Sequence, residues 1–232
     1  MREKSIETPT VERLKFETMQ YVIRRPRGFD PAKRYPCILF LHGSGTRGTD
    51  LGLLLGNPFF TALDRMEDFP FVVIAPQCHE YTWLDLFEQL SRLAKFAREL
   101  PYVDADRFYC LGTSMGGYGT WLLAESHPEL FAAIVPICGG GVCWSASQLK
   151  NVPVWAFHCQ GDPVVMLSES EHMVEWTNRF GGSARLTVYP EDSHNAWDAT
   201  YSNPEVFAWL LSHKNARAEA LEQNLSGSDK FG

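Results

Sequence analysis

The sequence predicts an α/β fold with a mainly parallel central sheet and helices on both of its faces. Strand-like apolar runs alternate with helical patterns along the chain, which is typical of parallel strands joined by crossover helices. Two of the runs, "CILFL" and "FVVIA", are continuously apolar, as in strands covered on both faces. With 232 residues and 45% apolar content, the chain has the size of one domain, or at most two small ones.

We expect one domain over residues 18–214, preceded by an N-terminal extension over residues 1–17. The remaining residues 215–232 turn rich in Gly and Ser, and we expect a frayed tail there. The expected strands are Met19–Arg24, Pro36–Leu41, Phe71–Ala75, Arg107–Leu111, Ala132–Ile137, Val152–His158 and Ala184–Tyr189. We expect Met19–Arg24 to pair antiparallel at an edge of the sheet.

Four helices are expected between and after these strands. They are Trp83–Leu100, Met115–Ser126, Ser168–Phe180 and Pro204–His213. One face of the first helix carries Leu86, Leu90, Leu93 and Ala97. The third stops at two glycines, and the last opens with an Asn-Pro pair that suits a cap and a first helical turn.

The composition excludes several classes of protein. The net charge is −7, and the one short basic patch, Arg24-Arg25-Pro26-Arg27, fits a loop edge, so we expect no nucleic-acid partner. No apolar run approaches the roughly 20 residues of a membrane span, so we expect no span. The first ten residues have charges but no apolar core, unlike a signal peptide, so we expect a cytoplasmic protein by default. A leader removed before this chain begins stays an open alternative.

Six cysteines are present, and none forms a CxxC pair or a zinc-ligand spacing. Most of them fall in or beside apolar runs, as buried free thiols do. A local bridge between Cys138 and Cys143 stays open as the less favoured alternative. We therefore expect no metal site.

The segment "FYCLGTSMGGYGTW" contains the first candidate for chemistry. Ser114 lies where an expected strand passes into an expected helix, at the carboxyl end of the strand, where ligands bind in α/β sheets. A tight turn there strains the serine backbone, and side chains at Gly112 and Gly116 would clash with neighbouring elements. Ser114 is therefore a candidate nucleophile. The alternative is a small residue in a Gly-rich turn, and "GTSMG" alone does not decide between them.

A serine nucleophile needs a base and an acid, and two further loops at the same sheet edge supply them. His194 lies in "YPEDSHNAW", after a strand and before the last helix. Asp162 follows another strand in "HCQGDPVV" and can orient the imidazole. Asp192 is a weaker alternative because a residue two positions from His194 rarely reaches its far ring nitrogen. Among the other histidines, His79 lies in a loop after a strand and stays an open alternative. The rest fit surface or structural positions, and His158 closes an apolar strand as a structural histidine.

A hole for a developing oxyanion needs two N–H donors. Met115 opens the helix after Ser114, and its free N–H points toward the same place. The second donor is expected from "LHGSGTRG", which follows the strand "CILF"; Ser44 is the first choice and Gly45 the second. The alternative is a plain Gly-rich turn. His42 is expected to support this loop rather than to take part in chemistry.

The chain resembles α/β-hydrolases, and more narrowly the compact phospholipase/carboxylesterase or "predicted peptidase" group near the dienelactone-hydrolase-like and feruloyl-esterase-like branches. The resemblance covers about residues 18–213, through "GFDPAKRYPCILFLHGSGTRGTD", "VIAPQC", "VDADRFYCLGTSMGGYGTW", "HPELFAAIVPICGGG", "VPVWAFHCQGDPVV" and "YPEDSHNAWDATYSNPEVFAWLL". It implies Ser114 as nucleophile, Asp162 as acid and His194 as base, with no cofactor. The chain departs from the group's usual pattern at Cys159, where Gly is usual, and at Met166, where Pro is frequent.

The expected activity is hydrolysis of short-chain or aryl esters through an acyl-enzyme. Only about 14 residues separate the strands ending at Ile137 and beginning at Val152, too few for a lid domain. The site should therefore be open, and Trp83, Trp144 and Trp197 are candidates for its wall, each with a core position as the alternative. The rival readings are a peptidase of the prolyl-oligopeptidase type and a ligand-binding receptor on a hydrolase scaffold. The sequence leaves the oligomeric state open.

Overall fold

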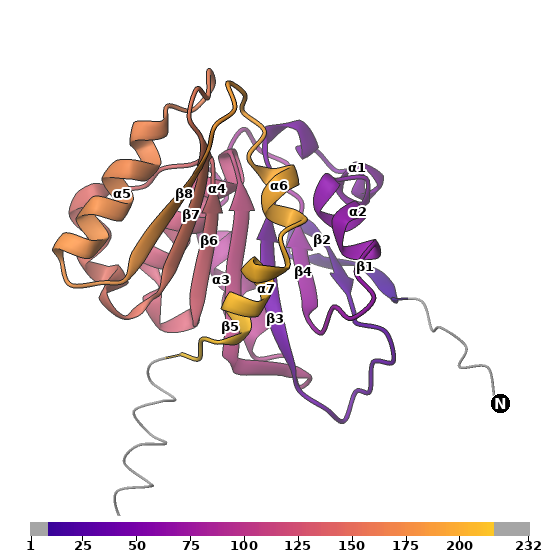
Figure 1. The fold of residues 1–232 in the computed structure, drawn as a ribbon. Helices are drawn as coiled ribbons and strands as arrows, with labels where there is room; N and C mark the ends of the chain where they lie inside the picture. The colour runs from indigo at the N-terminus through magenta and orange to yellow at the C-terminus, as the bar shows by residue number, and fades with distance from the viewer. Residues whose placement is uncertain (1–8, 216–232) are drawn as a thin grey trace, which may run out of the picture.

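The computed structural model describes residues 9–215, and within them one eight-stranded sheet forms the centre of the fold (Figure 1). The strands lie in the order β1-β2-β4-β3-β5-β6-β7-β8. Their bounds are β1 Val11–Phe16, β2 Met19–Arg24, β3 Tyr35–Leu41, β4 Val72–Pro76, β5 Val103–Thr113, β6 Ala133–Ile137, β7 Val154–Cys159 and β8 Ala184–Tyr189. The pairs from β4 through β8 are parallel, whereas β2 pairs antiparallel with both β1 and β4.

The expected fold class is confirmed, and seven of the eight strands in the described residues lie where the sequence predicted them. Strand β1 was missed, and it lies inside the predicted N-terminal extension, so the boundary at residue 18 is wrong. Its sequence, "VERLKF", lacks an apolar stretch, and five of its six residues are exposed. Backbone pairing with β2 from Val11↔Arg24 to Phe16↔Met19 defines this strand, which covers the antiparallel edge with charged residues. Strand β2 is therefore interior rather than at the edge.

Helices cover both faces of the sheet, as predicted. One apolar core packs under α3 (Phe87–Arg98), α4 (Met115–Ser126) and α5 (Leu167–Arg179). The other core packs under the helices that lie toward the front of Figure 1: α1 (Leu51–Leu55), α2 (Pro58–Asp64), α6 (Trp197–Tyr201) and α7 (Pro204–Leu211). The three helices α1, α2 and α6 were not predicted because each has at most seven residues, too few for a clear period.

The carboxyl end of the domain reaches one residue beyond the predicted boundary. Asn215 is buried, and its side-chain amide donates to the carbonyl of Glu129 at 2.9 Å. The rest of the predicted tail, residues 216–232, lies outside the described residues. All six cysteines are described and carry free thiols, so Cys138 and Cys143 are not bridged.

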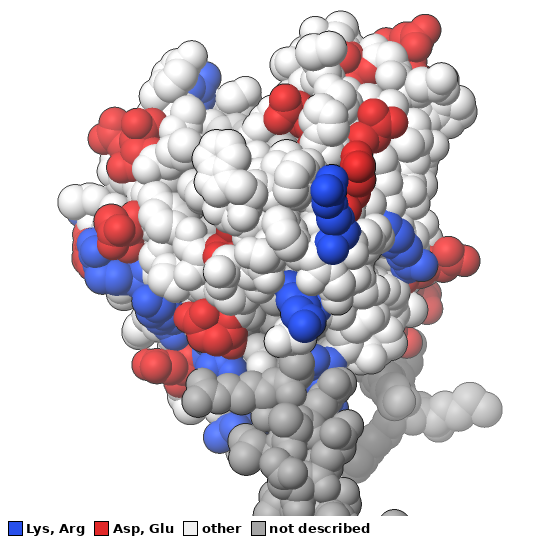
Figure 2. Space-filling model, turned by 90° about the vertical axis from the view of Figure 1, so that its left-hand side faces the viewer, with Lys and Arg blue, Asp and Glu red and all other residues white. Residues whose placement is uncertain are grey.

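No helix in the described part of the chain has the length and hydropathy needed to cross a membrane. Figure 2 shows the side of the molecule at the left of Figure 1, where α5 and β8 lie. On this face, acidic and basic side chains are interspersed around uncharged areas rather than gathered by sign.

Candidate active site

Ser114 occupies a strained turn between β5 and α4. Its backbone has φ 56° and ψ −117°, a conformation with positive φ that residues other than glycine rarely adopt. The approach of neighbouring backbone is close enough to require glycine on both sides: a Cβ on Gly112 would lie 2.2 Å from the Gly116 carbonyl oxygen, and one on Gly116 would lie 1.9 Å from that of Leu41. The predicted reason for the two glycines is therefore confirmed. The turn holds the Ser114 hydroxyl at the carboxyl edge of the sheet.

Three loops at this edge bring Ser114, His194 and Asp162 together in a hydrogen-bonded chain. The Ser114 Oγ lies 2.8 Å from His194 Nε2, and His194 Nδ1 lies 2.6 Å from Asp162 Oδ2. Since the carboxylate accepts, Nδ1–H donates to Asp162, and Nε2 is left to accept the Ser114 proton. This is the tautomer that a general base for serine requires. Asp192, the weaker alternative, is exposed and makes no such contact with His194.

The environment of Asp162 keeps it ionised. Burial of its side chain opposes the charge, but the hydrogen bond from His194 and the N–H groups of Val165 and Val164 outweigh burial, so the pKa of Asp162 is lowered. The two N–H groups bind Oδ1 at 2.9 and 2.8 Å, which leaves Oδ2 to face His194. The carboxylate is therefore rigidly held and charged when His194 takes up a proton.

The two expected oxyanion donors both lie near Ser114: Met115 follows it in the chain, and Ser44 lines the same hollow. Met115 is the first residue of α4, so its N–H has no acceptor within the helix. Ser44 opens the short helix η1 (Ser44–Thr46), and its carbonyl accepts from Arg47 Nε at 3.0 Å, which ties down this loop. Arg47 also donates to the Tyr81 carbonyl at 2.8 Å and stacks over the Tyr81 ring.

His42 supports the same loop from beneath, as the sequence suggested. Its Nε2 accepts from the N–H of Cys78 at 3.0 Å, and its Nδ1–H donates to the Gly43 carbonyl at 2.7 Å. Burial lowers the pKa of His42 to about 4, although the bond to Gly43 opposes this shift, so the imidazole is neutral. His42 thus links the loop of Gly43 to the loop of Cys78 through two hydrogen bonds.

Two open hollows meet at Ser44. One, of about 330 Å³, contains Ser114 and His194; its wall is completed by Gly43, Ser44, Gly45, Thr46, Asn57, Pro58, Thr113, Trp197 and Tyr201. The other, of about 340 Å³, is lined by Ser44, Arg47, Tyr81, Thr82, Leu84, Met115 and Tyr118. Neither lining contains Asp or Glu.

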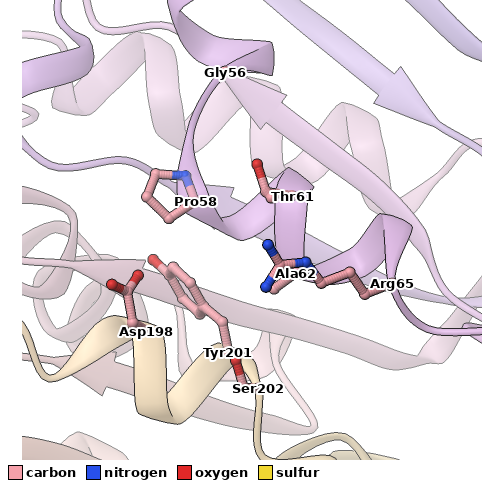
Figure 3. Close-up of a pocket in the computed structure, with 8 residues that line it drawn as sticks. All are labelled: Gly56, Pro58, Thr61, Ala62, Arg65, Asp198, Tyr201 and Ser202. Carbon is pink, nitrogen blue, oxygen red and sulfur yellow. The ribbon is translucent and has the colours of Figure 1, made fainter.

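A third hollow, of about 350 Å³, lies beside the first (Figure 3). Asp198 and Tyr201 of α6 lie across from Pro58 of α2, and Arg65 lies at its far end. Pro58 and Tyr201 also line the hollow that contains Ser114, so the two share a wall. The Tyr201 hydroxyl is hydrogen-bonded to that of Thr113, which anchors this wall to the end of β5.

The three tryptophans proposed for the wall have different positions. Trp197 lines the hollow of Ser114, and its ring lies edge-on to His194, with 5.3 Å between the ring centroids. Trp83 is a core residue, fully buried, with its indole N–H donating to the His42 carbonyl at 3.0 Å, so its assignment to the wall is wrong. Trp144 is 80% exposed and lines neither hollow.

One group of potential metal ligands occurs in the described residues: Cys138, Asp162 and His194, whose ligand atoms lie within 4.8 Å of one another. The chemistry of this set does not suit a metal. Burial raises the pKa of the Cys138 thiol to about 12, so it stays protonated, and thiols bind metals as thiolates. Asp162 and His194 Nδ1 are already engaged with each other. The arrangement fits proton transfer from serine.

Several lining residues were not predicted: Thr46, Arg47, Asn57, Tyr81, Tyr118 and Tyr201. Asn57 and Tyr201 belong to short helices without a sequence period, and their approach to Ser114 depends on how α2 and α6 pack. Arg47 belongs to the segment "LHGSGTRG". Its position three residues after Ser44 could have predicted a cation close to the oxyanion loop.

The comparisons with known proteins indicate the same fold. Residues 84–142 match the prolyl oligopeptidase family. A thermostable esterase of known structure is 32% identical, with a TM-score of 0.73 over 89% of this chain and 63% of that one. A dienelactone hydrolase structure from Klebsiella pneumoniae, itself an unproven assignment, has 18% identity and a TM-score of 0.66 over 89% of this chain and 98% of that one. Dipeptidyl-peptidase 5 of Porphyromonas gingivalis is 22% identical over 80% of this chain.

The sheet order and the hydrogen-bonded chain of Ser114, His194 and Asp162 have the arrangement found in serine hydrolases with an α/β fold. The chain belongs to the α/β-hydrolase superfamily. It spans about a third of the length of the dipeptidyl peptidase, 34%, and somewhat less than two thirds of the esterase, 63%. The substrates of those longer proteins are therefore not assigned to this chain.

Proposed function

We propose that this protein is a serine carboxylesterase that hydrolyses short-chain or aryl esters through an acyl-enzyme. The observation that carries the proposal is the position of Ser114 and its oxyanion loop between two small, open hollows without carboxylates. The similarity to a thermostable esterase, at 32% identity over most of this chain, supports it.

In the proposed mechanism, Ser114 Oγ attacks the ester carbonyl while His194 Nε2 takes its proton. Asp162 stabilises the imidazolium that forms, through the bond to Nδ1–H. The N–H groups of Ser44 and Met115 donate to the oxyanion, at about 3 kcal/mol for each donor. His194 then protonates the leaving alcohol, and water hydrolyses the acyl-enzyme by the same route in reverse. No step needs a metal or a cofactor.

The linings of the hollows favour small uncharged substrates. Tyr81, Leu84 and Tyr118 in one hollow and Trp197 in the other offer apolar contacts to aryl groups on either side of the ester. Volumes of about 330 and 340 Å³ are at the small end for ligand pockets, and both are open to solvent. Long acyl chains find no enclosing lid among the elements that surround Ser114.

A peptidase is the second candidate, because residues 84–142 match the prolyl oligopeptidase family and some relatives are dipeptidyl peptidases. An enzyme that removes dipeptides must hold a free amine, for which a carboxylate is the usual partner. The linings of the two hollows that meet at Ser44 contain none, and the second is lined by the cation of Arg47; the carboxylate of Asp198 lies in the third hollow, behind the wall of Pro58 and Tyr201. These linings support the esterase over an aminopeptidase.

The experiment is a direct comparison of ester and amide turnover. Purified protein is assayed with p-nitrophenyl esters of increasing acyl length and with dipeptidyl p-nitroanilides. We expect turnover of the short esters, falling with chain length, and no comparable turnover of the anilides. Ser114→Ala should abolish ester turnover and labelling by a fluorophosphonate. Faster turnover of the anilides would make the protein a peptidase, and no labelling of Ser114 would favour a receptor.

A further inference from the structure

A second histidine lies against the acid of the triad. His158 belongs to the end of β7, is fully buried and contacts three groups. Its Nδ1 lies 2.8 Å from Ser170 Oγ on α5, and its Nε2 lies 2.9 Å from the carbonyl oxygen of Val165. The same Nε2 lies 3.4 Å from Asp162 Oδ2, the oxygen that also accepts from His194.

Counting protons in these contacts determines the charge of His158. Ser170 Oγ donates its only proton to the carbonyl of Gly139 at 2.8 Å, so toward His158 it must accept. The Val165 carbonyl can only accept as well. Both ring nitrogens of His158 must therefore donate, whereas a neutral imidazole has one N–H. If the ring were neutral, one of these short buried contacts would bring two acceptor atoms together with no proton between them. Such a contact is unfavourable because both atoms are buried and neither is hydrogen-bonded there.

The other fully buried histidine gives the opposite result by the same count. His42 Nε2 faces the N–H of Cys78, a donor, and its Nδ1 faces the Gly43 carbonyl, an acceptor. One N–H satisfies both contacts, so His42 is complete when neutral. Its pKa, lowered by burial, agrees. The difference between the two rings therefore lies in their partners and not in their depth.

The surroundings of His158 compensate a positive charge. Asp162 is the nearest anion, and its pKa is lowered although its side chain is buried. The other titratable groups around this pair are His194, the thiols of Cys138 and Cys159, Tyr118 of α4 and Glu169 of α5. Burial raises the pKa of Cys138, Cys159 and Tyr118, so they are neutral near neutral pH. Asp162 is thus the direct counter-ion.

We propose that His158 is held as an imidazolium that pairs with Asp162 and acts as a positioning residue for His194. The second part rests on the proposed function of the triad. Asp162 Oδ2 lies between two imidazoles, one charged in the resting protein and one that becomes charged during catalysis. The charge on His158 offsets part of the field that Asp162 exerts on His194. It also fixes the turn from Asp162 to Val165, to which it is bonded.

The charge can be read directly, without any substrate. A long-range proton–nitrogen NMR spectrum of the full chain, with labelled histidine, is recorded at about pH 8, above the usual imidazole pKa of about 6.5. His158 is assigned from the spectrum of His158→Gln. We expect both of its ring nitrogens to be protonated, whereas His42 shows one protonated and one bare nitrogen. A bare ring nitrogen on His158 would overturn the proposal, whether or not the protein hydrolyses esters.

The effect on His194 is measured as the pH profile of kcat/KM for a short ester. In His158→Gln the field of Asp162 on His194 is no longer offset, so protonated His194 is favoured. The acid limb should move to higher pH by about 0.5–1 unit. The matched control, His172→Gln on the exposed face of α5, should leave the limb in place. A His158→Gln profile with lower activity but an unmoved limb would mean that His158 only packs. If the variant does not fold, His158 is assigned in the wild-type chain from the nuclear Overhauser effect between its ring and Ser170, and the NMR result decides.

Discussion

The indole N–H of Trp83 donates to the main-chain carbonyl of His42 at 3.0 Å, and both side chains are fully buried. His42 is the first residue after β3, and Gly43 and Ser44 of the proposed oxyanion loop follow it directly. The His42 carbonyl is therefore at the base of this loop. Its imidazole in turn holds Cys78 and Gly43. Trp83 thus supports the oxyanion loop from the core instead of lining the substrate cleft.

Trp83→Phe tests this support. The change leaves the buried His42 carbonyl without a donor and removes ring volume, so we expect a loss of about 1–3 kcal/mol in the free energy of unfolding. A looser oxyanion loop should also lower kcat more than it raises KM. Urea unfolding and ester kinetics measure the two effects. Trp144→Phe, at an exposed position, serves as the control and should match the wild-type protein in both.

The strained backbone of Ser114 predicts a difference between two inactive variants. Both Ser114→Ala and Ser114→Gly remove the nucleophile, but only glycine adopts φ 56° without strain. Ser114→Gly should therefore be more stable than Ser114→Ala by about 1 kcal/mol, although glycine usually destabilises. Urea unfolding of the two variants makes the comparison. Equal stability, or a less stable glycine variant, would contradict stored strain at this turn.

Asp162→Asn should leave the fold in place and lower kcat by roughly 10³–10⁴-fold, because an amide favours the wrong tautomer of His194. The control is Asp192→Asn, in the same loop as His194 but exposed, which should keep most of the activity. The reverse ranking of the two variants would assign the acid to Asp192.

Glu125 predicts a pH dependence of stability. Glu125 lies in the last turn of α4, where its carboxyl is buried with one oxygen unpartnered. Burial raises its pKa to about 7, although the hydrogen bond from the Val142 N–H opposes this shift. Between the ordinary value of 4.5 and about 7, the folded chain binds more protons than the unfolded chain, so stability falls as pH rises through this window. Glu125→Gln removes this loss.

The measurement is urea unfolding of both proteins at about pH 5 and about pH 8, on either side of most of this window. The stability of Glu125→Gln relative to the wild-type protein should increase on the order of 1–3 kcal/mol between the two, after allowance for partial solvation. Taking the difference between variants removes the contribution of all other titrating groups. A constant difference would mean that Glu125 is ionised in the folded protein at both pH values.

Trp197→Ala should raise KM for aryl esters several-fold, because the indole lines the hollow of Ser114 beside His194. The effect on an acetate ester of a small alcohol should be weaker, since less surface is in contact. Kinetics with both substrates measure the contrast. Trp144→Ala removes an exposed indole that lines neither hollow and should leave both KM values unchanged. Equal effects of the two changes would remove Trp197 from the substrate wall.

The elements that sequence analysis found share strong local patterns. Helix α4 was predicted with its observed bounds, Met115–Ser126, because a glycine-rich turn precedes it and His-Pro follows. The buried strands appear as apolar runs. Strand β1 and the short helices α1, α2 and α6 carry no such pattern, because pairing with β2 and packing against the sheet define them.

The sequence by itself determined the fold class and the three residues that meet at the carboxyl edge of the sheet. This was possible because parallel strands bring their ends to one edge, so Ser114, Asp162 and His194 could be placed without side-chain detail. Only the tertiary structure decided which tryptophan lines the cleft and which supports it. It alone also showed the acceptors that surround His158. An indole has the same chemistry in a core as in a wall, and the charge of a histidine depends on partners that distant elements supply.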